Sequence, residues 1–249
     1  MIKSTIFRGR EKLCTVAHMI KAIIFDFNGV IVDDEPLHEK AFRQACAEFD
    51  VSLSSEEYAA LCLGITDRQG AVRIQEKFGL TDEAREKLLQ RKSQLYLEFL
   101  KHDIHPVVGV IGLIQKLKGK FLLGIATAAY RGEVEFILQE LNIRDTFSII
   151  VTAQDVVKSK PDAEPYLAVA KKLGVIPVEC VVIEDTPSGI KSAKSAGMTC
   201  IAITTTRRRD ELKQADFIID NFSEISSDFS LLKKYPHFDV VGQGGDGGS

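Results

Sequence analysis

The sequence predicts an α/β protein, a Rossmann-like doubly wound parallel sheet with an inserted all-helical domain. From Gly109 onward, short apolar runs alternate with amphipathic helical patterns, which is the βαβ signature of a parallel sheet. Residues 35–105 contain helical patterns and no convincing strand pattern. A chain of 249 residues is close to the upper limit for one hydrophobic core. We therefore expect two lobes, one of them helical.

The predicted elements follow in chain order. Lys21–Asp26 is a short apolar run that ends in a carboxylate, which is typical of a buried parallel strand. The helical block comes next, and its apolar residues recur among charged ones at helical spacing. Further amphipathic helices are predicted at 133–141 and 163–173. The remaining strands are predicted at Phe121–Ala126, Phe147–Val151, Cys180–Glu184, Thr199–Ile203 and Phe217–Ile219.

These patterns divide the chain into segments. We assign residues 20–34 and 106–235 to the α/β core domain, and residues 35–105 to the helical domain inserted after the first core strand. Residues 1–19 are interpreted as an N-terminal extension, because most of them lack helical or strand periodicity. Residues 236–249 are expected to be a flexible C-terminal tail, since the final stretch is rich in glycine.

Composition excludes several classes of function. The 32 Lys and Arg residues against 35 Asp and Glu residues give a formal net charge of −3, so no nucleic-acid partner is expected. The basic run Arg207–Arg209 is followed by Asp210 and Glu211 and is interpreted as a solvated face. The 5 cysteines contain no Cys-x-x-Cys, which argues against a disulfide framework or a zinc site. No apolar run is long enough for a membrane span, and we expect a cytoplasmic protein without a membrane partner.

The chemistry is expected at the carboxyl ends of the strands, where open parallel sheets bind ligands. The first strand ends in Asp26-Phe27-Asn28-Gly29, the second is followed by Thr127, and another ends in Glu184-Asp185. Lys160 follows the third strand and precedes the next helix. A carboxylate nucleophile, a hydroxyl group, an ammonium group and an acidic pair would thus converge on one point.

Such a group of residues is suited to phosphate chemistry. A phosphoryl group is anionic and would be repelled by carboxylates alone, so a cation is required. Asp26 and Asp185 are hard oxygen donors suited to Mg²⁺, and Glu184 could hold a water molecule bound to it. Thr127 and the backbone N–H groups after it can bond phosphate oxygens, while Lys160 supplies positive charge. Asp26 could then attack phosphorus to give an aspartyl-phosphate, which water hydrolyses.

Each of these residues also has a structural interpretation. Glu184 and Asp185 could cap the helix that begins at Pro187, and Thr127 could cap a helix as well. Lys160 could be a solvated charge beside a proline that starts a helix. Their combination at successive strand ends favours the functional interpretation.

In these motifs the chain resembles the haloacid dehalogenase superfamily. The resemblance is to its branch of phosphatases and β-phosphoglucomutase-like enzymes, which carry a helical cap after the first motif. It covers roughly residues 20–235, in the order of the family's motifs. The matching segments are Ile24–His38, Thr127, Lys160–Leu167 and Val181–Gly197.

The resemblance implies specific roles for these residues. Asp26 would be the nucleophile and a metal ligand, the backbone carbonyl of Asn28 a second ligand and Asp185 a third. Thr127 and Lys160 would bind the phosphate, and Mg²⁺ is the implied cofactor. The substrate would be a small phosphorylated metabolite.

Further residues are implied in substrate binding. His38 and Lys92 match cap positions that contact sugar phosphate, or the mobile aspartate, in mutase-like members, and Gly64 matches the glycine of the cap loop. Arg68 falls one place later than the mutase arginine, which disfavours a mutase. The full set of expected substrate-binding residues is His38, Gly64, Arg68, Lys92, Thr127, Ala128 and Arg131.

The main departure from the family is Asn28. The family's phosphatases carry an aspartate there as general acid and base, and asparagine cannot transfer that proton. We therefore expect a phosphatase for a small, sugar-like phosphomonoester whose turnover is slowed by Asn28. Two alternatives stay open: a β-phosphoglucomutase-like isomerase, and a sugar-phosphate binding or regulatory protein that has lost turnover.

Overall fold

The computed structural model describes residues 18–63, 65–225 and 238–240. Its centre is a six-stranded, fully parallel sheet in the order β4-β3-β2-β5-β6-β7. The first core strand, β2, therefore lies in the middle of the sheet, between β3 and β5. The strands are β2 Ala22–Phe25, β3 Leu122–Ala126, β4 Ile149–Val151, β5 Cys180–Glu184, β6 Thr199–Ile203 and β7 Phe217–Ile219. The predicted fold class is confirmed.

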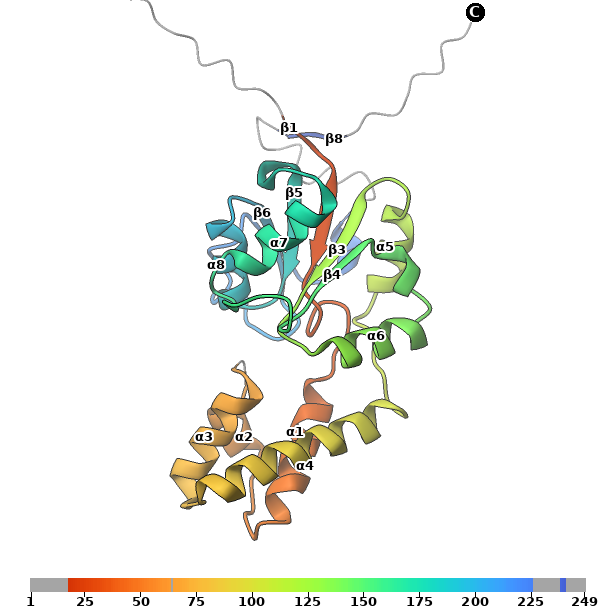
Figure 1. Cartoon of the computed structure of the whole chain (residues 1–249). Helices are drawn as coiled ribbons and strands as arrows, with labels where there is room; N and C mark the ends of the chain where they lie inside the picture. The colour runs from red at the N-terminus through yellow and green to blue at the C-terminus, as the bar shows by residue number, and fades with distance from the viewer. Residues whose placement is uncertain (1–17, 64, 226–237, 241–249) are drawn as a thin grey trace, which may run out of the picture.

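Helices cover both faces of the sheet (Figure 1). α7 Glu164–Leu173 and α8 Pro187–Ser195 pack on one face, while α5 Val110–Leu117 and α6 Arg131–Glu140 lie on the other. Along β2, Ala22 and Ile24 join the core cluster beneath α7 and α8, whereas Ile23 and Phe25 join the opposite one. Because successive side chains point to opposite faces, a strand buried on both faces must be apolar throughout. This explains the continuous apolar runs in the sequence.

Short 3-10 helices lie in the connections between the strands and helices of the α/β lobe. They are η1 Arg144–Thr146, η2 Pro177–Glu179 and η3 Phe222–Glu224.

The cysteines of the described residues are buried and form no disulfide: Cys46, Cys62, Cys180 and Cys200.

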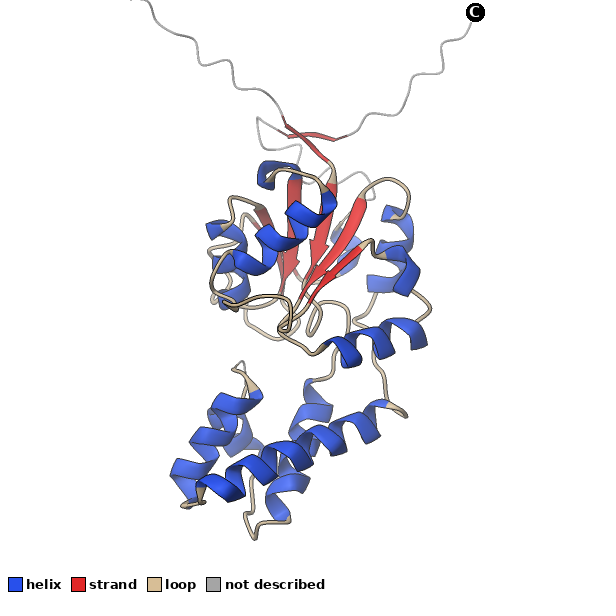
Figure 2. Ribbon diagram, viewed as in Figure 1, coloured by secondary structure: helices blue, strands red, loops and turns tan. Residues whose placement is uncertain are grey.

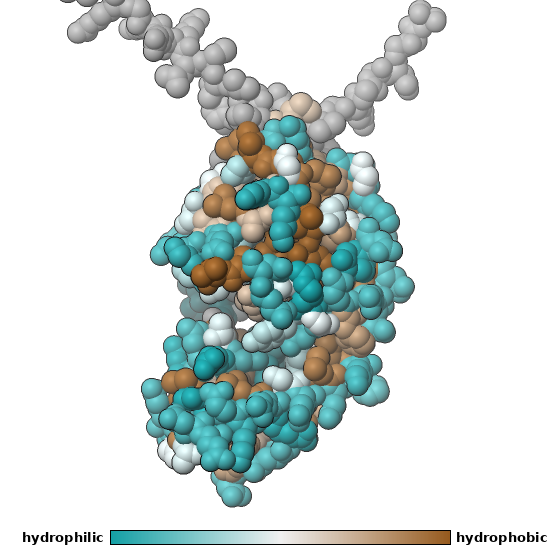
Figure 3. Space-filling view, viewed as in Figure 1, coloured by the Kyte–Doolittle hydropathy of each residue, from teal (hydrophilic) through white to brown (hydrophobic). Residues whose placement is uncertain are grey.

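Four helices form a separate lobe, here called the cap. They are α1 Glu35–Ala47, α2 Ser55–Leu61, α3 Asp67–Phe78 and α4 Asp82–Leu100. Local sequence starts several of them: Ser54 and Thr66 are N-caps with reciprocal capping boxes, and Thr81 caps α4. The long helices α1 and α4 pack against each other. Figure 3 shows that the face of the cap in view is largely hydrophilic, as expected for helices that bury one apolar stripe.

Two linkers connect the cap to the core. They run side by side, because the Asp33 N–H donates to the His105 carbonyl at 2.8 Å and the Val107 N–H donates to the Ile31 carbonyl at 3.0 Å. The strand arrowheads point toward the cap in Figure 2. The carboxyl edge of the sheet, where ligands are expected, therefore faces the cap.

The two ends of the chain differ in part from expectation. β1 His18–Ile20 pairs in parallel with β8 Phe238–Val240. The first two residues of β1 lie in the segment that we interpreted as an extension, and β8 lies in the expected flexible tail. Phe238 and Val240 are strand-forming residue types, and the glycine-rich composition begins only after them. The rest of those segments lies outside the described residues.

Close packing of β3 against α7 gives a test of this fold. A Cβ atom on Gly124 would lie 2.5 Å from Val169 Cγ1, so Gly124→Ala forces strand and helix apart. We expect a loss of about 1–3 kcal/mol in the free energy of unfolding, measured by urea denaturation. Gly112→Ala in α5 is the control, because its Cβ meets nothing within 4 Å. That variant should be neutral or up to about 1 kcal/mol more stable, and equal losses in both would contradict the packing.

Candidate active site

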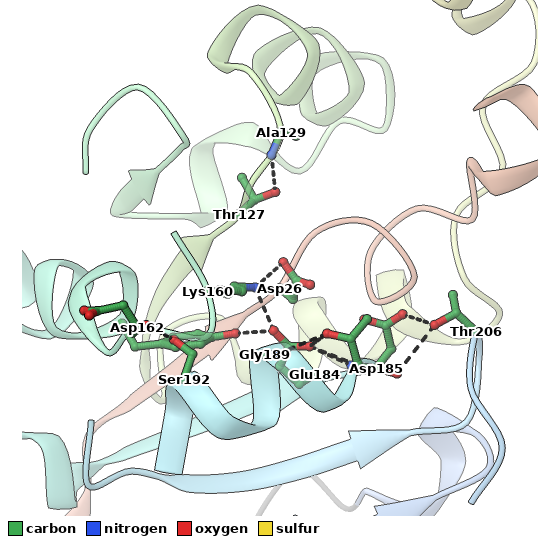
Figure 4. A network of polar contacts seen from close by, with 12 residues as sticks. Asp26, Thr127, Ala129, Lys160, Asp162, Glu184, Asp185, Gly189, Ser192 and Thr206 are labelled. Carbon is green, nitrogen blue, oxygen red and sulfur yellow. Dashed lines mark hydrogen bonds and ion pairs between the residues drawn. The ribbon is translucent and has the colours of Figure 1, made fainter. Parts of the chain in front are cut away.

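The predicted residues meet at the carboxyl edge of three adjacent strands (Figure 4). Asp26 follows β2, Thr127 follows β3, and Glu184 ends β5 with Asp185 directly after it. Lys160 lies between β4 and α7. Because β2 is hydrogen-bonded to both β3 and β5, residues from distant parts of the chain come together at one place.

Lys160 is the positive centre of the site. Its Nζ lies 2.7 Å from Asp26 Oδ1 and 2.7 Å from Glu184 Oε1, and the side chain is only 10% exposed. Burial alone would lower the pKa of Lys160, but the two carboxylates outweigh burial and raise it. The ammonium group therefore stays charged and orients the Asp26 carboxylate.

Glu184 is bound by the protein through both of its oxygens. Oε1 accepts from Lys160 and, at 2.7 Å, from the Tyr166 hydroxyl, while Oε2 accepts from the backbone N–H groups of Asp185 and Thr186. Burial alone would raise the pKa of Glu184, but Lys160 and these hydrogen bonds keep it below its ordinary value. Glu184 thus holds its neighbours in place. Its expected part in holding a metal-bound water stays a prediction.

Asp185 carries an unpartnered oxygen. Its Oδ2 accepts from the Thr206 hydroxyl, whereas Oδ1 is buried and has no hydrogen-bond partner among the described residues. Gly29 makes the close approach possible: its φ is +74°, and a Cβ there would lie 2.1 Å from Asp185 Oδ2. A buried carboxylate oxygen left without a donor is expected to face a cation.

The acidic cluster of Asp26, Glu184 and Asp185 fits a divalent metal ion. One oxygen from each lies within 4.8 Å of the others. Burial, with the Glu184 carboxylate, raises the pKa of Asp26 to about 7 although Lys160 opposes the change. Burial and the carboxylates of Glu184 and Asp26 also raise the pKa of Asp185. The single ammonium group of Lys160 does not balance the negative charge of three carboxylates. Their oxygens are hard donors, which suit Mg²⁺.

The expected phosphate binders differ in their surroundings. Thr127 is buried, and its Oγ1 accepts the Ala129 N–H at 3.0 Å, so its hydroxyl proton can be donated to a ligand. Ala128 is exposed. The Arg131 guanidinium pairs with Asp155 at 2.6 Å, and also with Glu135. Arg131 Nη2 also donates to the Ile150 carbonyl at 3.2 Å, and none of these bonds joins the guanidinium to Asp26 or Lys160. A phosphate contact by Arg131 therefore stays a prediction.

The cap residues lie apart from the acidic cluster. Lys92 is 1% exposed, and its Nζ lies 2.5 Å from both His38 Nδ1 and Asp67 Oδ2. Arg68 projects from the surface, where its guanidinium lies 3.9 Å from Glu86 Oε1. Gly64 lies outside the described residues. The structure brings His38 and Lys92 together and leaves Arg68 at the surface.

Asn28 points toward the cap. Its Nδ2 donates to Asp34 Oδ2 at 2.6 Å, and Asp34 also accepts from the Tyr96 hydroxyl at 2.5 Å. Burial alone would raise the pKa of Asp34, but the bonds with His38, Tyr96 and Asn28 outweigh it and the pKa is lowered. Sequence reasoning did not select Asp34, because nothing local to it indicates these partners.

A second missed residue is Thr206, which bonds Asp185 from the loop after β6. The rule that located the other residues, polar groups after strand ends, would have found it. This loop and Leu63 of the cap line an open cleft. The cleft is also lined by Arg207, Arg208 and Arg209, which directly follow Thr206. Arg208 pairs with Asp210 and Glu211, and Arg209 pairs with Asp220, as is usual on a solvated face.

Comparison with known proteins identifies the family. The model of haloacid dehalogenase-like hydrolases matches residues 23–203. The chain belongs to this family. The resemblance read from the sequence and the expected enzyme class, a hydrolase, are thereby confirmed.

The curated relatives of this family member include phosphatases. A phosphorylated carbohydrates phosphatase of Thermotoga maritima is 30% identical over 183 residues, covering 72% of this chain and 82% of the relative. The fructose-1-phosphate phosphatase YqaB of Escherichia coli is 28% identical over 181 residues, covering 73% of this chain and 95% of the relative.

Solved structures agree with the fold. A mutant of CbbY from Rhodobacter sphaeroides, in complex with xylulose-(1,5)bisphosphate, matches with a TM-score of 0.73 and 27% identity, over 84% of this chain and 97% of that one. The β-phosphoglucomutase of Clostridium difficile matches with a TM-score of 0.72 and 27% identity, over 87% of this chain and 96% of that one. Within the described residues, no helix is both long and apolar enough to cross a membrane.

The acidic cluster predicts stabilisation by metal. Millimolar Mg²⁺ should raise the melting temperature, since a ligand that binds only the folded state stabilises it by mass action. Asp185→Asn should lose most of this shift, because it removes a negative charge from the cluster. Asp82→Asn, at the exposed start of α4, is the control and should keep the shift. Equal shifts in all three proteins would place the metal elsewhere.

Magnesium affinity should depend on pH. The raised pKa of Asp26, about 7, means that below this pH the metal-free protein holds a proton that a cation must displace. The apparent dissociation constant should rise by up to about tenfold per pH unit below neutrality and level off above it. Calorimetry in buffers of different ionisation enthalpy measures both affinity and proton release. A constant affinity without proton release would contradict the raised pKa.

Proposed function

We propose that this protein is a magnesium-dependent phosphatase that acts on a small, sugar-like phosphomonoester through an aspartyl-phosphate. The observation that carries the proposal is the position of Asp26. Its carboxylate is paired with Lys160 and belongs to the acidic cluster, in which Asp185 Oδ1 is buried without a partner among the described residues. The phosphatase activities named for the relatives support the same reaction and the same class of substrate.

The metal would be held by Asp26, Asp185 and the backbone carbonyl of Asn28. When bound there, Mg²⁺ supplies positive charge that offsets the charge of the carboxylates and of the phosphoryl group. Glu184 would act mainly by holding Lys160, since its two oxygens are engaged by protein donors.

The first chemical step is transfer of the phosphoryl group to the protein. Thr127 and the backbone after it would bind phosphate oxygens, and Lys160 would contribute positive charge. An Asp26 oxygen attacks phosphorus, the bond between phosphorus and the ester oxygen breaks, and the sugar leaves as an alkoxide that takes a proton from solvent water. In the second step water attacks the aspartyl-phosphate and releases inorganic phosphate, which regenerates Asp26.

Asn28 makes both steps slow. An amide can neither protonate the leaving oxygen nor deprotonate water, and loss of a general acid or base costs about 10²–10⁴-fold in rate. Substrates with good leaving groups should suffer least in the first step.

The cap would select the substrate. His38 and Lys92 belong to it, and the site faces it. Hinges at residues 33–36 and 105–109 would let the cap close over the substrate and exclude water.

A mutase is the second candidate, favoured by the likeness to β-phosphoglucomutase. It would transfer the phosphoryl group of Asp26 back to a second sugar hydroxyl instead of to water. Phosphorus NMR distinguishes the two reactions, because a mutase interconverts sugar phosphates without releasing phosphate.

The proposal predicts slow but real turnover. With Mg²⁺, the protein should release phosphate from at least one member of a panel of sugar phosphates and from an aryl phosphate. Asp26→Asn should lose at least about 10³-fold, because the nucleophile is gone. Asp82→Asn serves as the control and should match the unchanged protein. Substrate binding with neither phosphate release nor interconversion of sugar phosphates in a single turnover would overturn the proposal in favour of a binding protein.

A further inference from the structure

Asp34 lies where the core, the linker and the cap meet. It is the residue before α1 and is 2% exposed. Its Oδ2 lies 2.6 Å from Asn28 Nδ2, 2.5 Å from the Tyr96 hydroxyl and 3.2 Å from His38 Nε2. Three donors from three different elements thus converge on one oxygen, which a charged carboxylate accommodates better than a neutral amide.

The contacts continue into the cap. The His38 ring stacks on Tyr96 with centroids 4.2 Å apart, and Nδ1 of the same ring lies 2.5 Å from Lys92 Nζ. Lys92 in turn bonds Asp67, the first residue of α3. Because Nδ1 faces an ammonium donor and Nε2 faces a carboxylate, the imidazole accepts on one side and donates on the other. A continuous polar chain therefore joins Asn28 to the start of α3 in the cap.

We propose that Asp34 is a positioning residue that fixes the orientation of the Asn28 amide and couples it to the cap. This inference rests on the proposed function for its kinetic consequences. A carboxylate only accepts hydrogen bonds, so it holds the NH₂ group of Asn28 toward itself and turns the amide oxygen away. The same carboxylate is held by Tyr96 and His38, so a shift of α1 or α4 changes the position of the Asn28 side chain.

The pairing constrains what a substitution at residue 28 can achieve. Asn28→Asp alone replaces a donor with a second acceptor, so the hydrogen bond is lost and two carboxyl groups face each other at about the same short distance. Exchanging the pair, with Asn28→Asp and Asp34→Asn together, restores one donor and one acceptor. It also places a carboxyl group where the family's phosphatases have their general acid and base.

The experiment is a double-mutant cycle on residues 28 and 34, measured as steady-state phosphate release with Mg²⁺. The exchanged pair should exceed Asn28→Asp in kcat by at least about tenfold, since residues in direct contact couple strongly. Asp34→Asn alone should lower kcat for an aryl phosphate and leave its KM nearly unchanged, because Asp34 is only 2% exposed and offers a substrate no surface to contact. Equal rates for Asn28→Asp and the exchanged pair would overturn the proposal.

A second readout does not depend on activity. The side-chain NH₂ of Asn28 should give a nitrogen-proton NMR signal that exchanges slowly with water, and Asp34→Asn and Tyr96→Phe should each shift it and speed its exchange. Tyr58→Phe is the matched control: its hydroxyl also donates to a carboxylate, Glu35, but has no bond to Asn28. An Asn28 signal unchanged by Asp34→Asn would overturn the proposal. The Asn28 signal could respond to Asp34→Asn and Tyr96→Phe as predicted while none of the proteins shows phosphatase activity. That result would support the positioning role and refute the proposed function.

Discussion

The site depends on the burial of three carboxylates around one ammonium group. Lys160 bridges Asp26 and Glu184, whereas Asp185 is paired only through one oxygen. Burial and mutual repulsion raise the pKa of Asp26 and of Asp185, so the protein by itself does not neutralise the cluster. A site with such excess charge is suited to a divalent cation and an anionic substrate whose charges balance each other.

Two glycines allow this crowding. Gly29 adopts a positive φ and lets the turn after β2 approach Asp185, while Gly189 in α8 leaves room for the Glu184 carboxylate. A Cβ on Gly189 would lie 1.6 Å from Glu184 Oε1, closer than any side chain tolerates. The carboxylates of Asp185 and Glu184 therefore fit into the site because the backbone next to them carries glycine at residues 29 and 189. Thr186, the N-cap of α8, bonds Glu184 and the helix at once, so helix start and site are built from the same residues.

The cap contributes a second polar system. Its buried Lys92 and Tyr96 and its partly buried His38 are bonded to carboxylates, which offsets the cost of removing polar groups from water. The carboxylate of Asp34 connects this system to Asn28, two residues after the nucleophile. If the cap moves on its two linkers, this hydrogen bond would carry the movement to the loop after β2.

The sequence by itself determined the α/β class, the helical insertion, the order of the strands along the chain and the acids at their ends. Periodicity and strand-end chemistry are local, and local patterns are readable from neighbouring residues. Only the tertiary structure decided that Asp34 meets Tyr96, 62 positions away, that Thr206 bonds Asp185, that both oxygens of Glu184 are occupied and that Arg131 pairs with Asp155. These contacts depend on how the linkers and the order of strands in the sheet place distant elements, and no residue spacing along the chain encodes that geometry.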